Sequence, residues 1–265
     1  IGKNVQDIGD FAFSECKNIK SISGAFESLK TIGLNAFFNC ERMAGNIVFP
    51  NAVEIIPNYA FFGCRSLNSI KFGDSLREIG DYAFYYCINL TGKLDLPSTL
   101  YSLGNYSFCG CYNLTGVLSI PPYVQEIKEY AFYYCKGITE LQMTNNITTI
   151  YQSAFCNCEE LTSITFSDNL SVINDYAFAY CYKLKSIELP YNLTTISRYG
   201  FYDCSSVSSI VFNDNVTDIQ YNAFAYCTTL TELKLPDQLE EINERVFASC
   251  TNLLTISFPA NLTKI

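Results

Sequence analysis

Histidine and tryptophan are both absent from this chain of 265 residues, and its 26 aspartates and glutamates outnumber its 17 lysines and arginines. Without histidine, the chain lacks the commonest general base and the commonest neutral metal ligand. The net charge of −9 and the scattered basic residues disfavour binding to nucleic acid or to an anionic membrane surface, because both need a clustered basic face. No apolar run approaches the roughly 20 residues that span a bilayer, so we predict no direct membrane insertion.

Catalytic chemistry has correspondingly little support. No serine, cysteine or aspartate has a histidine to activate it, and carboxylates such as Glu54, Glu159 and Glu241 are spread among predicted turns. We therefore expect a protein that is not an enzyme, with no catalytic residue, no bound metal and no cofactor.

Cysteine, in contrast, is abundant and regularly spaced. Of the 13 cysteines, eleven follow one another at intervals of 23 or 24 residues: Cys16, Cys40, Cys64, Cys87, Cys111, Cys135, Cys158, Cys181, Cys204, Cys227 and Cys250. Self-similarity at such a period is typical of a solenoid, in which each repeat buries its apolar face against its neighbours. We therefore predict a single domain over residues 1–265, built from about eleven repeats of 23 or 24 residues.

Each repeat contains the signals of one short strand and one short helical turn. After Cys181, the apolar residues Leu184, Ile187 and Leu189 are followed by Pro190, which predicts a short strand around the alternating Ile-x-Leu. Stacked once per repeat, about 4.8 Å apart, such strands form a long parallel sheet. The Ala-Phe-x-x-Cys segment is too short for a regular helix, so it predicts a 3₁₀ or single helical turn on the opposite side.

The repeat resembles the BspA-type, or Treponema-type, leucine-rich repeat family, whose pattern L-x-x-I-x-L-P-x-x-L-x-x-I-x-x-x-A-F-x-x-C recurs along essentially the whole chain. A phenylalanine stands three residues before each repeat cysteine: Phe13, Phe37, Phe61, Phe84, Phe108, Phe132, Phe155, Phe178, Phe201, Phe224 and Phe247. The resemblance implies an α/β repeat fold, a right-handed leucine-rich repeat solenoid with short 3₁₀ or helical turns. It also implies a surface-exposed or secreted protein, of a kind associated with binding fibronectin and fibrinogen.

The chain begins inside a repeat, at Val5 and Ile8, and ends inside another, at Leu262 and Ile265. Because uncapped solenoid ends expose core, this suggests a fragment of a longer protein that lacks both caps.

The repeat cysteines are expected to be small buried residues beside the phenylalanines. Their parallel Cβ vectors, about 4.8 Å apart, are too widely spaced for unstrained disulfides. A line of sulfurs also fails to converge on a tetrahedral zinc ion. Cys109 and Cys156 break the pattern because each follows the phenylalanine directly, and we expect both to face outward.

Two surfaces are candidates for binding. The first lies along the turn side, where tyrosine is enriched: Tyr85, Tyr86, Tyr133, Tyr134, Tyr180, Tyr202 and Tyr226. Tyrosine gives a large contact area at low side-chain entropy, but these residues can also pack on one another between coils. The second is the solvent face of the sheet, where the residues are small or of mixed charge: Ser163, Thr165, Ser186 and Glu188.

Three functions remain open at this point. The leading hypothesis is a non-enzymatic, adhesin-like binding protein, at the cell surface or secreted, whose partner is a host matrix or plasma protein or another protein. The first alternative is a scaffold that links protein subunits, with a cytoplasmic location. The second is a glycan-binding module, in which alanine at Tyr85, Tyr133 and Tyr202 abolishes sugar binding and leaves folding intact.

Overall fold

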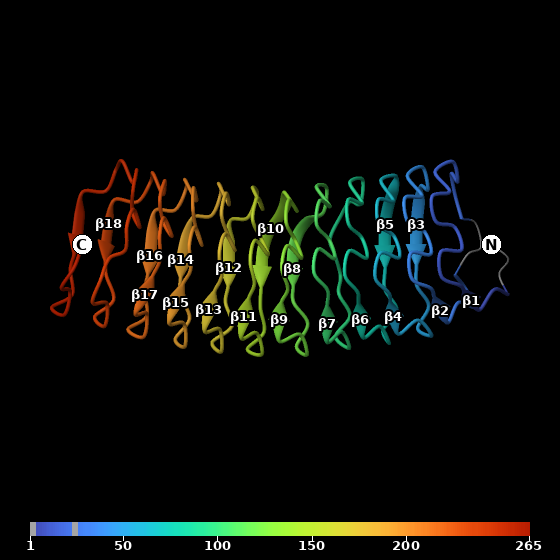
Figure 1. Cartoon of the computed structure of the whole chain (residues 1–265), viewed down its shortest axis with the longest axis horizontal. Helices are drawn as coiled ribbons and strands as arrows, with labels where there is room; N and C mark the ends of the chain where they lie inside the picture. Colours follow the sequence, from blue (N-terminus) through green and yellow to red (C-terminus); the bar gives the residue numbers. More distant parts are fainter. Residues whose placement is uncertain (1–3, 23–25) are drawn as a thin grey trace.

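The computed structural model of the chain describes residues 4–22 and 26–265. The chain forms an elongated stack of coils, and its two termini lie at opposite ends of the long axis (Figure 1). Contacts between neighbouring coils hold such a stack together, so the core runs along its whole length.

The predicted strands form one row along the stack (Figure 1). Their bounds are β3 (Gly45–Val48), β5 (Leu67–Lys71), β8 (Thr115–Ser119), β10 (Gly137–Gln142), β12 (Ser163–Thr165), β14 (Ser186–Glu188), β16 (Ser209–Val211), β18 (Glu232–Lys234) and β19 (Thr255–Ser257). They pair in parallel, for example with Leu141 of β10 opposite Ile164 of β12, and form four separate sheets: β3–β5, β8–β10–β12, β14–β16 and β18–β19. The prediction of short parallel strands is therefore confirmed, whereas the single long sheet predicted for them is divided into shorter ones.

A second row of strands, each of two residues, was not predicted. These strands are β1 (Asp7–Ile8), β2 (Thr31–Ile32), β4 (Ile55–Ile56), β6 (Glu78–Ile79), β7 (Ser102–Leu103), β9 (Glu126–Ile127), β11 (Thr149–Ile150), β13 (Val172–Ile173), β15 (Thr195–Ile196) and β17 (Asp218–Ile219). In each, the second residue is a buried isoleucine or leucine of the repeat pattern. Five of them, β9 to β17, form one continuous parallel sheet.

The repeat phenylalanines stack in a single column inside the coils. The Phe61 and Phe84 rings are 5.3 Å apart and within 2° of parallel, and the Phe155 and Phe178 rings repeat that spacing. From Phe37 to Phe224, these rings are almost completely buried. This column, flanked by the buried leucines and isoleucines, is the core.

The predicted 3₁₀ or helical turn is wrong, because no helix occurs in the described residues. Within each Ala-Phe-x-x-Cys segment, backbone N–H groups donate alternately to the next coil and to the same turn. Phe61 N–H donates to Ala83 in the next coil over 2.8 Å, whereas Phe62 N–H donates back to Tyr59 over 3.2 Å. Tyr59 and Gly63 have φ angles of 58° and 67°, in the left-handed region that a right-handed helix excludes. The segment is a chain of tight turns that bonds to its neighbour like a strand.

The repeat cysteines are free and, apart from the exposed Cys16, buried. They do more than fill space: the thiol of Cys64 donates to the carbonyl oxygen of Phe37 in the previous coil over 3.2 Å. The same bond recurs at every later repeat cysteine and at Cys40. Burial raises the pKa of the Cys40 thiol to about 11.

The expected outward orientation of Cys109 and Cys156 is also wrong, since both are only 3% exposed. The backbone and Cβ atom at this position lie beneath the surface, since Ala179 and Ala225, which occupy it in later coils, are also fully buried. A tyrosine at the same position is long enough to reach solvent, whereas a cysteine is not. Burial accordingly raises the pKa of both thiols to about 12.

Candidate binding surfaces

An inner column of tyrosines stands two residues before the repeat phenylalanines. It runs through Tyr59, Tyr82, Tyr106 and Tyr130, is interrupted at Ser153, and resumes with Tyr176 and Tyr199. Neighbouring rings stack almost parallel, 4.6 Å apart for Tyr82 and Tyr106 and 4.5 Å for Tyr106 and Tyr130. Every tyrosine of the column has a φ angle between 54° and 58°. Ring stacking between coils offsets the strain of this left-handed backbone.

An outer set of tyrosines lies beside this column and contains the predicted turn-side candidates. Tyr85 contacts Tyr86, and Tyr133 contacts Tyr134, with ring centroids 4.5 Å apart in both pairs. Further along the stack, Tyr202 contacts both Tyr180 and Tyr226. All seven predicted tyrosines are half-buried or exposed, so they pack on one another and also present an edge to solvent. Here we call the inner column and the outer set together the tyrosine surface.

Three hydroxyl groups of this surface are held as neutral hydrogen-bonding groups by partial burial. Partial burial raises the pKa of Tyr85, Tyr106 and Tyr176 to about 12 in each case. A neutral phenol both donates and accepts a hydrogen bond, which suits recognition of polar groups on a partner.

One coil interrupts the tyrosine surface. Between Tyr133 and Tyr180 the equivalent positions hold smaller side chains, and a hollow of about 520 Å³ opens there. Its lining is Tyr130, Tyr133, Tyr134, Gln152, Ser153, Cys156, Asn157, Tyr176, Tyr180 and Tyr182. Three of the predicted tyrosines line it, while Tyr85, Tyr86, Tyr202 and Tyr226 do not. Sequence reasoning missed Ser153 and Asn157, although the absence of tyrosine from the turn of this coil was a visible signal.

The second predicted surface, on the sheet, is also exposed. Ser163 and Thr165 lie on β12, and Ser186 and Glu188 lie on β14, where each pair flanks an inward-facing isoleucine. All four are exposed, as strand alternation predicts. The face offers small and charged groups, and a shallow hollow of about 290 Å³ opens on it further along, over β16, β18 and β19.

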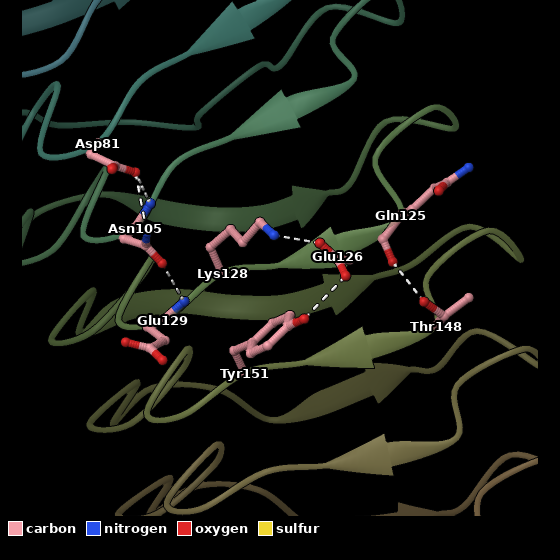
Figure 2. Close-up of polar contacts among 8 residues, drawn as sticks. All are labelled: Asp81, Asn105, Gln125, Glu126, Lys128, Glu129, Thr148 and Tyr151. Carbon is pink, nitrogen blue, oxygen red and sulfur yellow. Dashed lines mark hydrogen bonds and ion pairs between the residues drawn. The ribbon is translucent and has the colours of Figure 1, made fainter.

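A polar network beside β9 and β11 illustrates how charged side chains are used between coils (Figure 2). The Asp81 carboxylate accepts the backbone N–H of Asn105 over 2.7 Å, and Asn105 Oδ1 accepts that of Glu129 over 3.2 Å. Glu126 lies between Lys128 and the hydroxyl of Tyr151, as Figure 2 shows. The hydrogen bond from Lys128 holds the pKa of the Glu126 carboxyl below its ordinary value. These groups satisfy one another and join successive coils.

The comparison with protein families identifies the repeat. A family model described as "BspA type Leucine rich repeat region (6 copies)" matches residues 1–115, 30–160 and 148–265. The chain belongs to the BspA-type leucine-rich repeat family. The resemblance stated from the phenylalanine and cysteine pattern is thereby confirmed.

Solved structures agree with this BspA-type assignment at the level of fold. A leucine-rich cell surface protein from Faecalibacterium prausnitzii shares 24% identity with a TM-score of 0.52, over 96% of this chain and 69% of its own. A leucine-rich repeat protein from T. pallidum shares 27% identity with a TM-score of 0.54, over 56% of this chain and 72% of its own. A search of curated proteins found no match.

Two further properties of this BspA-type solenoid concern metal ions and membranes. In residues 4–22 and 26–265, no three cysteine or carboxylate side chains cluster closely enough to hold a metal ion. Over the same residues, there is no helix of the length and apolarity needed to cross a membrane.

Proposed function

We propose that this solenoid is a non-enzymatic protein-binding module of the cell surface or of a secreted protein, and that it contacts its partner through the tyrosine surface. The observation that carries the proposal is the packing of half-exposed tyrosines on a rigid, hydrogen-bonded stack of turns. Tyr133 and Tyr134, for example, hold each other at 4.5 Å in an edge-to-face contact. Rings that are already fixed lose little side-chain entropy on binding, and tyrosine is enriched at binding hot spots.

The extent of the surface also suits a protein partner. From Tyr85 to Tyr226 it crosses six coil steps, or roughly 30 Å at the spacing of stacked strands. A standard interface buries about 800 Å² on each partner, which a strip of this length can supply. The net charge of −9 favours a partner that is neutral or basic.

The sheet face is the weaker candidate. Ser163, Thr165, Ser186 and Glu188 provide no aromatic anchor, and hot spots are enriched in aromatic residues and arginine. These four residues therefore serve as the comparison surface in the test below.

A structural scaffold is the second candidate function, and the free thiols favour it. All 13 cysteines of the chain lie in the described residues and are unpaired. Proteins that persist in an oxidising environment usually pair their cysteines, whereas a reducing compartment leaves them free. A scaffold would join subunits of an intracellular assembly and bind no host protein.

The test is binding of the protein to immobilised fibronectin and fibrinogen and to a glycan panel. Two double variants are matched: Tyr202→Ala with Tyr226→Ala on the tyrosine surface, and Ser186→Ala with Glu188→Ala on the sheet. We expect saturable binding to a protein that weakens at least tenfold in the tyrosine variant only. Loss in the sheet variant alone would move the interface to the sheet. Absence of saturable binding to every protein tested would favour the scaffold.

A further inference from the structure

The tyrosine surface is interrupted at one coil, residues 151–158, in a way that creates a slot. In this coil the inner column has Ser153, the position after the phenylalanine has Cys156, and the next position has Asn157. The preceding coil has Tyr130, Tyr133 and Tyr134 at these three positions. The following coil has Tyr176, Ala179 and Tyr180. One coil thus lacks every ring that would fill the space between its neighbours.

The slot has the width of one aromatic ring. Tyr130 stacks on Tyr106 at 4.5 Å, and Tyr176 stacks on Tyr199 at 4.4 Å, so each has one covered face. Because rings of the column stack nearly parallel, the other faces of Tyr130 and Tyr176 are the ones directed along the column toward the coil of Ser153. They are separated by two coil steps, or about 9.5 Å. A single planar ring placed midway would lie at nearly the stacking distance that the rest of the column uses.

The floor of the slot is polar and buried. Ser153 is 4% exposed and Asn157 is 9% exposed, and both line the hollow. Asn157 Nδ2 donates to the Cys156 sulfur over 3.2 Å. Among the described residues, no hydrogen bond reaches Asn157 Oδ1 or the Ser153 hydroxyl, and neither atom is a buried group without a partner, so both are open to solvent through the hollow. A ligand hydroxyl that enters the slot can therefore replace water as their hydrogen-bond partner.

The rim adds one more polar group. Gln152 Nε2 donates to the hydroxyl of Tyr130 over 3.0 Å, which fixes the ring that forms one wall. The side-chain oxygen Oε1 of Gln152 lies on an exposed residue at the edge, where it can accept a backbone N–H from a bound chain.

We propose that this slot is a socket for the phenol ring of a tyrosine side chain on the partner protein. The ring enters hydroxyl first, stacks between Tyr130 and Tyr176, and hydrogen-bonds to Ser153 and Asn157. It completes the inner column with a ring from another molecule. A phenylalanine would stack equally well but would leave the floor without partners. The proposal rests on the proposed protein-binding function and names the anchor residue of its partner. A pyranose ring is the competing occupant.

The experiment measures binding of small probes by saturation-transfer NMR, with N-acetyl-L-tyrosinamide, N-acetyl-L-phenylalaninamide and methyl glycosides of glucose, galactose and N-acetylglucosamine. For a probe of this size we expect a Kd on the order of a millimolar for the tyrosine amide. The phenylalanine amide should bind about tenfold more weakly, since it leaves buried polar groups unpaired.

Matched variants locate the site. Ser153→Tyr fills the slot and should weaken binding of the tyrosine amide at least tenfold. Asn35→Tyr adds a ring at the same repeat position of another coil and should leave binding unchanged. The backbone is comparable at the two positions, with φ angles of 53° at Ser153 and 54° at Asn35. Asn157→Gly removes the floor amide, with Gly63 and Gly110 as precedents at this position, and should reduce the preference for tyrosine over phenylalanine.

Each outcome decides the proposal. Should Ser153→Tyr fail to fold, Tyr176→Ala removes one wall instead and should give the same tenfold loss. Equal binding of both amides, or binding that survives both Ser153→Tyr and Tyr176→Ala, would overturn the socket. Binding of a glycoside without the tyrosine amide would overturn it in favour of a sugar site. These readouts need no macromolecular partner, so a failed socket leaves binding to fibronectin or fibrinogen as an independent test of the proposed function.

Discussion

The thiol of Cys135 donates a hydrogen bond to the carbonyl oxygen of Phe108, 27 residues earlier in the chain, over 3.2 Å. The same oxygen accepts the backbone N–H of Cys111, also over 3.2 Å. Each repeat cysteine from Cys40 to Cys250 therefore joins its own coil to the turn of the previous one. This contact gives cysteine a role that alanine, which has no hydrogen-bond donor in its side chain, could not fill.

Replacing Cys135 with alanine should lower the free energy of unfolding by about 1–3 kcal/mol. The change removes one buried hydrogen bond and leaves a small void. Urea denaturation followed by circular dichroism measures the effect. The matched control is Cys16→Ala, at the exposed repeat cysteine, which should stay within about 0.5 kcal/mol of the parent. Equal stability of the two variants would contradict a structural role for the buried thiol.

Stability should fall at alkaline pH. Burial raises the pKa of Cys40 and Cys250 from the ordinary value of 9.0 to about 11. The folded protein keeps thiol protons that the unfolded chain releases, so this stabilisation is complete below pH 9 and is lost as the pH rises toward 11. Each such thiol contributes a slope of up to about 1.4 kcal/mol per pH unit.

The measurement for this prediction is circular dichroism from pH 8 to pH 11.5, with titration of reactive thiols in parallel. We expect loss of strand signal to coincide with the appearance of reactive cysteines. Below pH 9, only the exposed Cys16 should react rapidly. Retention of the full strand signal above pH 11, or early reactivity of the buried thiols, would contradict the argument.

The core could be predicted from the sequence because it repeats. Phe178, Cys181 and Ile187 each occupy a position that holds a similar residue in most other repeats, and all three are buried. A pattern read eleven times over leaves little ambiguity about which face is apolar. The short strand at Ile187 followed from the same alternation.

The turn could not be predicted in the same way. Spacing of three between Phe61 and Cys64 is equally compatible with a helical turn and with consecutive tight turns. The difference depends on the φ angle of 58° at Tyr59, which is uncommon for any residue other than glycine. A positive φ angle at a tyrosine is not visible in the linear pattern, because the ring that stacks on Tyr59 comes from the next coil.

The slot was missed for a related reason. It consists of residues that are unremarkable singly, such as Ser153 and Asn157, and arises only when three neighbouring coils are compared column by column. The outward orientation expected for Cys156 hid it further, since the buried thiol is part of the lining. How deeply a residue lies beneath the neighbouring tyrosine side chains depends on packing between coils, and the linear pattern does not contain that information.

Phe178→Ala should lower the free energy of unfolding by about 3–5 kcal/mol, because it removes a fully buried ring from the column and leaves a cavity. Phe178 stacks on Phe155 and Phe201 at 5.3 Å in both cases. Phe258→Ala is the control, since Phe258 is 53% exposed and its loss should change stability little. Urea denaturation measures both variants. A loss below about 1 kcal/mol for Phe178→Ala would contradict the assignment of this ring to a buried, stacked core column.

Tyr106→Gly should be more stable than Tyr106→Ala, by about 1 kcal/mol, although glycine is normally the less stable of the two. Both variants lose the same ring contacts with Tyr82 and Tyr130, so the difference between them isolates the backbone. Tyr106 has a φ angle of 54°, which strains alanine and not glycine. Ser186, in the extended strand β14, provides the reversed control, where Ser186→Ala should be more stable than Ser186→Gly. Urea denaturation of the four variants measures both differences. If alanine were more stable than glycine at both positions, the left-handed backbone would not determine stability at residue 106. The argument that ring stacking offsets backbone strain in the tyrosine column would then be wrong.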